Sequence, residues 1–310
     1  MNIPKTATIS QMQTIFGITI SIFALIVLSF LAFVLFGRLT ARDRTALVQP
    51  HQTIEVDGRS RKYRFYSPNP DEKLPLVVML HGYNYDSGRA SEIYSGWSNL
   101  AKETGEFAVV YPEGIARSWN GGFCCGYAYA RNINDVRFIK QLVDRLESDH
   151  KLSGQRHIVG FSNGSFLAQR LLAEQPDLFA SGAAVMTGIG EKDGDQLDLS
   201  GATAPLMIVT GAEDGYTNHD ISRRGFRFSS VETTLETWSS QLNVTQSDDS
   251  ETDNYSQLTY QTDGNQTKLI YREYPTGHRW PMWRLWMFND EYSPFTEDIW
   301  RTLQLLTQER

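Results

Sequence analysis

Apolar and polar positions follow two different periodicities along the chain, and these predict strands and helices in alternation. Short apolar runs rich in β-branched residues are typical of buried strands. Segments with apolar residues three and four positions apart predict helices. The strand-like runs cover 74–80, 107–111, 157–161, 180–186, 205–210 and 268–274. The helix-like segments cover 91–103, 134–149, 163–174, 231–242 and 295–306.

Two further extended pieces, 53–56 and 62–66, precede this alternation and are separated by the turn pair Asp57-Gly58. A hairpin followed by repeated strand–helix units predicts an α/β protein whose mostly parallel central sheet has helices on both faces. In such sheets the chemistry lies beyond the carboxyl ends of the strands. Candidate functional residues are therefore sought just past those ends.

The first 50 residues have a different pattern. From Ile15 to Phe36 the chain has no charged residue, and that length spans the hydrocarbon core of a bilayer. A cleaved signal peptide is the alternative, but its apolar region would be shorter and would end in small residues. We expect an N-terminal tail (1–14), a transmembrane anchor (15–37), a linker (38–50) and an α/β catalytic domain (51–310). The protein is then a single-pass membrane protein.

Charge flanking the apolar run bears on its orientation. Lys5 precedes the run, whereas Arg38, Arg42 and Arg44 follow it. The positive-inside rule would then place the catalytic domain in the cytoplasm, although that rule weakens for a large domain.

The composition limits which molecules and ions we expect the protein to bind. The net charge of −7 argues against nucleic acid, whose phosphates need a basic face. No zinc-ligand spacing occurs, and the acidic stretch 248–253 lacks the order of a calcium loop, so no metal is expected and this stretch is interpreted as a solvated insertion. Cys124 and Cys125 are adjacent, which leaves two thiols and a vicinal disulfide as alternatives.

The motif Gly160-Phe-Ser-Asn-Gly164 carries the main chemical signal. It lies between a predicted strand and a predicted helix, which is the setting of a nucleophile elbow. In this turn a strained serine needs small residues two positions to either side. The helix N-terminus favours developing negative charge. Ser162 is the candidate nucleophile, and an ordinary N-cap serine is the alternative.

A nucleophilic serine needs a base and an acid that orients it, in the chain order serine, acid, histidine. Only His219 and His278 follow Ser162. His278 lies in a glycine-bearing loop past the last predicted strand, so it is the better base. Asp214 lies just past the 205–210 strand and is the candidate acid, with Glu213 as the neighbouring alternative.

Backbone N–H groups should bind the oxyanion that forms during acyl transfer. One belongs to the residue after the nucleophile, Asn163, and the other to the loop after the 74–80 strand, where Tyr83 is the candidate. Trp119 and Trp280 are tentative substrate-pocket residues. Trp280, Trp283 and Trp286 could equally pack the sheet edge.

Together, these motifs resemble the polyhydroxybutyrate depolymerase and feruloyl esterase-like group of α/β hydrolases, also called LpqC-like or carbohydrate esterase family 1-like. The resemblance covers about residue 61 to the C-terminus. The matching pieces are LHG (80–82), VVYPEG (109–114), SWN (118–120), CCG (124–126), NDVRFI (134–139), GFSNGS (160–165), TGAED (210–214) and GHRWP (277–281).

The resemblance implies an α/β-hydrolase fold, the triad Ser162, Asp214 and His278, and carboxylic ester substrates. Members cleave polyesters, acyl groups on polysaccharides, or small esters, and they are usually exported, which would make the domain extracytoplasmic. Met282 replaces a glycine common in the family, and 243–265 diverges, so polymer substrates are less secure than ester hydrolysis.

We therefore predict a cofactor-independent serine esterase that acts through an acyl-enzyme. Two alternatives remain open. A serine peptidase or thioesterase could use the same triad, or the chain could be a non-catalytic, membrane-tethered binding module.

Overall fold

The computed structural model describes residues 48–83, 88–124, 126–192, 195–217, 221–223, 226–281 and 293–308. The predicted tail and anchor, and most of the predicted linker, lie outside these residues. Among the residues that are described, no helix is long and apolar enough to cross a membrane. The boundaries predicted for the anchor and the catalytic domain stay predictions.

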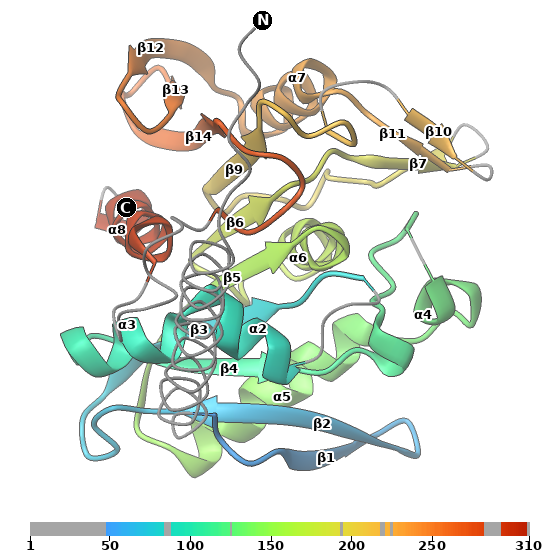
Figure 1. Ribbon diagram of the computed structural model, residues 1–310, viewed down its shortest axis with the longest axis vertical. Helices are drawn as coiled ribbons and strands as arrows, with labels where there is room; N and C mark the ends of the chain where they lie inside the picture. The colour runs from blue at the N-terminus through green and yellow to red at the C-terminus, as the bar shows by residue number, and fades with distance from the viewer. Residues whose placement is uncertain are drawn as a thin grey trace, which may run out of the picture. The chain divides into compact units, whose positions relative to one another are not determined.

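A ten-stranded mixed sheet forms the centre of residues 48–308, as Figure 1 shows. Six neighbouring strands, β4-β3-β5-β6-β9-β14, run parallel, and antiparallel strands extend the sheet at both edges. In sheet order the strands are β1 (Gln52–Val56), β2 (Arg59–Tyr66), β4 (Ala108–Pro112), β3 (Leu74–Leu80), β5 (Leu152–Phe161), β6 (Ser181–Val185), β9 (Leu206–Gly211), β14 (Thr267–Tyr274), β13 (Ser256–Gln261) and β12 (Thr245–Glu251).

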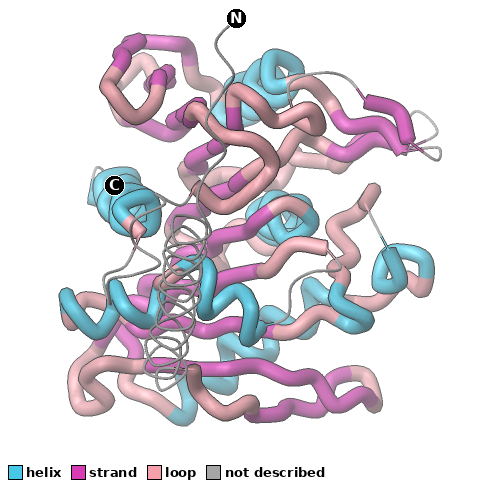
Figure 2. The backbone as a smooth tube through the Cα atoms, viewed as in Figure 1, coloured by secondary structure: helices cyan, strands magenta, loops and turns pink. Residues whose placement is uncertain are grey.

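Helices cover both faces of this sheet, as the tube in Figure 2 also shows. Alternate residues of the central strands point to opposite faces, so that Val78 packs in one core and Val77 in the other. One core includes side chains of α5 (Asp135–Asp149), α6 (Asn163–Glu174) and α7 (Val231–Leu242). The second core includes side chains of α3 (Trp97–Thr104) and α8 (Pro294–Gln308), and Tyr94 of α2 (Gly88–Ser95) packs against it. The predicted parallel sheet between two helical layers is confirmed.

Two expectations on local structure were incomplete. The single helix expected at 91–103 is two helices, because Gly96 adopts the left-handed conformation (φ 69°) and ends α2. The acidic stretch 248–253, expected as a solvated insertion, is indeed exposed, but most of it belongs to β12, which pairs with β13 at the sheet edge.

A second, four-stranded antiparallel sheet was not expected from the sequence. It consists of β10 (Ile221–Arg223), β11 (Phe226–Phe228), β7 (Gly190–Lys192) and β8 (Asp195–Gln196). These strands have two or three residues each, which is too short for a periodic pattern to show. The ring of Phe228 lies 5.5 Å from that of Phe166 in α6, so this sheet is anchored beside the helix that follows Ser162.

Candidate active site

Ser162 occupies a strained turn between β5 and α6. Its backbone angles are φ 51° and ψ −116°, a combination that residues other than glycine rarely adopt. A Cβ atom on Gly160 would lie 2.3 Å from the carbonyl oxygen of Gly164, so no larger residue fits there. The close approach of these two glycines is what the turn requires, as the spacing of the motif predicts.

Hydrogen bonds from both sides hold the turn. The N–H of Ser162 donates to the carbonyl of Val185 in β6 (2.8 Å). Ser165 Oγ lies 2.8 Å from the Gly160 oxygen and 2.7 Å from the Val185 oxygen. The strain at Ser162 is therefore supported by the neighbouring strand and by the first turn of α6.

Ser162, His278 and Asp214 form one hydrogen-bonded series. Ser162 Oγ lies 2.8 Å from His278 Nε2, and His278 Nδ1 lies 2.8 Å from Asp214 Oδ2. The Asp214 side chain is fully buried, and that of His278 is 28% exposed. Since the carboxylate can only accept, Nδ1 carries the proton and Nε2 can accept from the serine. These distances lie within the range for a nucleophile and its general base.

The loops that carry the acid and the histidine are joined by their backbones. β9 and β14 are parallel neighbours, and their pairing extends past the strand ends. The N–H of Ala212 donates to Tyr274 O (2.9 Å), and that of Glu213 donates to Thr276 O (3.0 Å). The other oxygen of Asp214, Oδ1, accepts from the N–H of Tyr216 at 2.9 Å.

Of the alternative acid and the alternative base, the structure describes only the acid, Glu213. Glu213 is exposed, whereas its neighbour Asp214 faces His278. His219 lies outside the described residues.

The candidate oxyanion donors come from two separate segments. Asn163 is the first residue of α6, so its N–H has no acceptor within the helix. Tyr83 follows β3 in the loop that begins with His81. A Cβ atom on Gly164 would lie 2.5 Å from Leu80 O and 2.6 Å from His81 O, so this loop passes directly against the start of α6.

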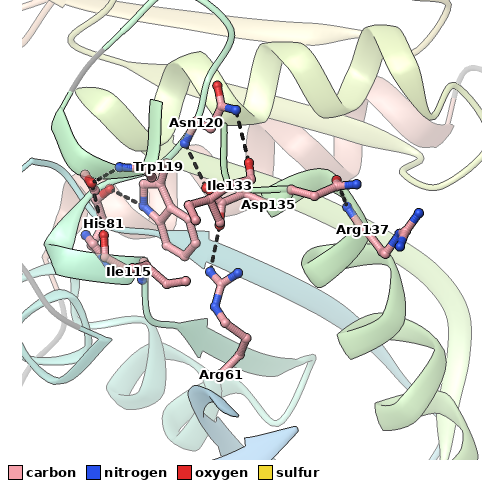
Figure 3. A network of polar contacts seen from close by, with 12 residues as sticks. Arg61, His81, Ile115, Trp119, Asn120, Ile133, Asp135 and Arg137 are labelled. Atoms are coloured by element: carbon pink, nitrogen blue, oxygen red, sulfur yellow. Dashed lines mark hydrogen bonds and ion pairs between the residues drawn. The ribbon is translucent and has the colours of Figure 1, made fainter. Parts of the chain in front are cut away.

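The segment between β4 and α5 packs over this region through Trp119. Its indole Nε1 donates to the carbonyl of His81 at 2.9 Å, as Figure 3 shows. Its backbone N–H donates to Asn163 Oδ1 at 2.7 Å, and its carbonyl accepts from Asn163 Nδ2 at 3.2 Å. Trp119 is fully buried and stacks at 6.4 Å on Phe138 of α5.

The side chain of His81 also bonds the segment between β4 and α5. Its Nδ1 lies 2.7 Å from Gly82 O, and its Nε2 accepts from the N–H of Gly114 at 2.9 Å. These bonds require a neutral ring with the proton on Nδ1. Burial lowers the pKa of His81 to about 4, which keeps the ring neutral at physiological pH.

A buried ion pair also holds the segment between β4 and α5 in place. Arg61 of β2 lies 2.7 Å from Asp135, and both side chains are almost fully buried. The second oxygen of Asp135 accepts from the N–H of Asn120 at 2.8 Å, and Asn120 also bonds the carbonyl of Ile133 (Figure 3). The Arg61 guanidinium lies 3.8 Å from the centre of the Phe138 ring.

The tentative pocket residues are both buried. Trp119 has the contacts described above. Trp280 is 3% exposed, packs against Phe161 and Phe295, and donates to Thr296 Oγ1 at 3.3 Å. Trp283 and Trp286 lie outside the described residues. Neither tryptophan side chain is exposed to a ligand in this structure, and their role in substrate binding stays a prediction.

Sequence reasoning missed the side chains of His81 and Asn163. Both lie inside motifs noted above, LHG and GFSNGS, but a backbone role was the only one considered for the second. Cys124 is disulfide-bonded, which favours the disulfide over free thiols for this residue. Cys125 lies outside the described residues.

The chain is similar to several known proteins. Residues 55–292 match the Esterase family, described as "putative esterase". A protein of Nocardia uniformis subsp. tsuyamanensis named "putative esterase NocK" is 34% identical over 137 residues, which are 43% of this chain and 39% of that protein. Poly(3-hydroxyalkanoate) depolymerase C of Paucimonas lemoignei is 30% identical over 149 residues, 46% of this chain and 35% of that protein. The matches span well under half the length of these relatives.

Solved structures show the same fold at low sequence identity. Acetyl xylan esterase from Aspergillus awamori superimposes with a TM-score of 0.55 at 15% identity, covering 75% of this chain and 95% of that one. A ferulic acid esterase gives a TM-score of 0.51 at 15% identity, covering 85% and 99%. The fold is therefore that of the α/β hydrolases, and the chain belongs to the Esterase family.

Proposed function

We propose that this protein is a serine-dependent carboxylic ester hydrolase that works through an acyl-enzyme. The observation that carries the proposal is the hydrogen-bonded series from Ser162 through His278 to Asp214, with the serine on a strained turn at a helix N-terminus. This is the arrangement in which a neutral imidazole can activate a hydroxyl.

The chemistry follows from the direction of the hydrogen bonds. His278 Nε2 takes the proton of Ser162 as the oxygen attacks the ester carbonyl. The imidazolium that forms is stabilised by Asp214, which holds the ring through Nδ1. The same proton then passes to the leaving alcohol, and water cleaves the acyl-enzyme by the reverse route.

The tetrahedral intermediates carry negative charge on the former carbonyl oxygen. The N–H groups of Asn163 and Tyr83 are the donors we assign to it. The dipole of α6 adds to their effect, because Asn163 begins that helix. Donors of this kind are each worth about a hundredfold to a thousandfold in rate.

We propose two classes of substrate from the relatives' names. One is a hydroxyalkanoate polyester, and the other is an acetyl or feruloyl ester of a polysaccharide. A thioesterase or peptidase with the same triad is tested by comparing kcat/KM on ester, thioester and amide forms of one acyl group. We expect kcat/KM to be highest for the oxygen ester.

The deciding experiment uses the full-length chain in detergent. It measures fluorophosphonate labelling and p-nitrophenyl acetate turnover for wild type, Ser162→Ala and Ser247→Ala. Ser247 is an exposed serine of β12 and serves as the matched control. We expect both signals to vanish only in Ser162→Ala. A folded wild-type protein that neither labels nor turns over would overturn the proposal and favour a binding module.

A further inference from the structure

The two segments that carry the oxyanion donors are bridged by one residue. Trp119 bonds Asn163 with its backbone, through both the N–H (2.7 Å) and the carbonyl (3.2 Å). It bonds the β3 loop with its side chain, since the indole N–H donates to His81 O at 2.9 Å. Trp119 therefore spans from the residue after Ser162 to the start of the loop that carries Tyr83.

Such a bridge is needed because the two segments are distant in sequence. Tyr83 follows β3, whereas Asn163 begins α6, and neither N–H can fix the position of the other. A donor displaced by about 1 Å loses much of its effect on a transition state. The oxyanion site therefore depends on the contacts that set the separation of the two segments, which are the close packing of Gly164 on Leu80 and His81 and the bridge through Trp119.

Other contacts stiffen the bridge itself. Trp119 is fully buried, and its ring is 4.8 Å from His81 and 6.4 Å from Phe138. The next residue, Asn120, is held by the buried carboxylate of Asp135. These contacts and its complete burial leave Trp119 no exposed surface for a ligand.

We propose that Trp119 is a positioning residue that holds the two oxyanion donors at their working separation, with the Asn163 side chain as its partner. This inference rests on the proposed function. It assigns Trp119 to transition-state stabilisation instead of substrate binding. A wall of the acyl pocket would discriminate between substrates, whereas a residue that positions the oxyanion donors affects every ester alike.

Trp119→Phe separates these roles, because it keeps an aromatic ring while it removes the donor to His81 O together with part of the indole volume. We expect kcat/KM to fall about 10- to 100-fold, by the same factor for p-nitrophenyl acetate and butyrate. The inhibition constant of a trifluoromethyl ketone should rise by that factor, since its adduct with serine places an oxyanion at the same donors. A change confined to one chain length would overturn the inference and indicate a pocket wall.

Trp97→Phe is the matched control. Trp97 is also fully buried, but its indole Nε1 has no hydrogen-bond partner among the described residues, so the variant loses the same ring volume without losing a hydrogen bond. We expect wild-type kinetics and inhibition. Thermal melting of each variant checks that the proteins compared are folded.

A second variant covers the case in which Trp119→Phe does not fold. Asn163→Ala keeps the backbone N–H and removes the side chain that pairs with Trp119. It should give the same chain-length-independent loss, and the double variant should lose little more than the larger single loss. Wild-type activity in both folded single variants would overturn the inference. Absence of turnover in the wild type would instead overturn the proposed function.

Discussion

The segment between β4 and α5 and the ribbon formed by β12 and β13 contrast in both secondary structure and burial. The first, residues 113–134, has little regular structure beyond α4 (Gly126–Ala130) and one turn of 3₁₀ helix, yet Trp119 and Asn120 within it are buried. The ribbon is an antiparallel pair with one register shift between Gln246 and Asp248, and every residue of β12 is exposed. Regularity and burial are thus separate properties in this molecule.

The difference lies in how each segment satisfies its backbone groups. The ribbon does so through a ladder of bonds that any sequence could make. The 113–134 segment does so through specific side chains, those of Asn163, Asp135 and His81. A buried irregular segment needs such partners, because unpaired polar groups away from water are costly. Its sequence is therefore the more constrained of the two.

The largest expected effect that sharpens this comparison comes from the buried ion pair. Asp135→Ala leaves Arg61 charged and buried without its partner, so we expect a loss of about 3–5 kcal/mol in the free energy of unfolding. Urea denaturation measures it. The exposed pair of Arg137 and Asp57 is the matched control, because Arg137→Ala should cost under about 1 kcal/mol. Equal losses for the two would contradict the comparison.

Two glycines offer the next test. A Cβ atom on Gly121 would lie 2.4 Å from Phe166 Cβ and 2.9 Å from Leu167 N, so Gly121→Ala should destabilise by about 1–3 kcal/mol. On Gly264, in the turn after β13, a Cβ would lie 3.8 Å from Thr262 Oγ1, which is ordinary van der Waals contact. Gly264→Ala should change the unfolding free energy by less than about 0.5 kcal/mol. Thermal melting compares both, and a tolerant Gly121 would show that the loop is loosely packed.

The pH dependence of stability tests the buried groups. Burial lowers the pKa of His81 to about 4 and that of His157 to about 4, so between pH 6.5 and 4 the unfolded chain takes up protons that the folded chain does not. Stability then falls as the pH is lowered. Burial raises the pKa of Glu92 to about 7, so this folded carboxyl keeps its proton and opposes that fall between pH 7 and 4.5.

Glu92→Gln removes the opposing effect. From pH 6 to pH 5 we expect the unfolding free energy of this variant to fall by about 2 kcal/mol, against about 1 kcal/mol for the wild type. Urea titrations at the two pH values measure both falls. Identical falls in the two proteins would show that Glu92 is ionised in the folded state over this range.

The smallest effect belongs to the ribbon. Asp249 is exposed on β12, and Asp249→Ala should change stability by less than about 0.5 kcal/mol and leave ester turnover unchanged. A loss near that of Asp135→Ala would mean that the ribbon is as constrained as the buried loop. The same urea and p-nitrophenyl ester assays apply.

The sequence predicted those parts of the fold that bury continuous apolar surface. The run from Leu74 to Leu80 is apolar because both of its faces are covered, so its pattern identified β3. The positions of Ser162, Asp214 and His278 could be predicted because each follows a strand of this kind. Their catalytic roles stay predictions until they are tested by experiment.

Other features leave no periodic trace. β12 reads TQSDDSE, and only backbone bonds to β13 define it. Gly96 ends α2 through its left-handed conformation, which the sequence permits without requiring. The contacts of His81 and Asn163 join segments that are far apart in the chain, so no local pattern indicates them.

The long separation between the site's residues also bears on when activity arises during synthesis. Asp214 and His278 are 64 positions apart, and His278 and Ser162 are 116 apart. The histidine reaches them only after β14 has paired with β9 near the end of the chain. Contacts of such range form late in folding, because their loop-closure entropy must first be overcome. In the proposed mechanism, a nascent chain that has emerged only as far as β9 therefore has the serine without its base, and we expect hydrolysis only after β14 has docked.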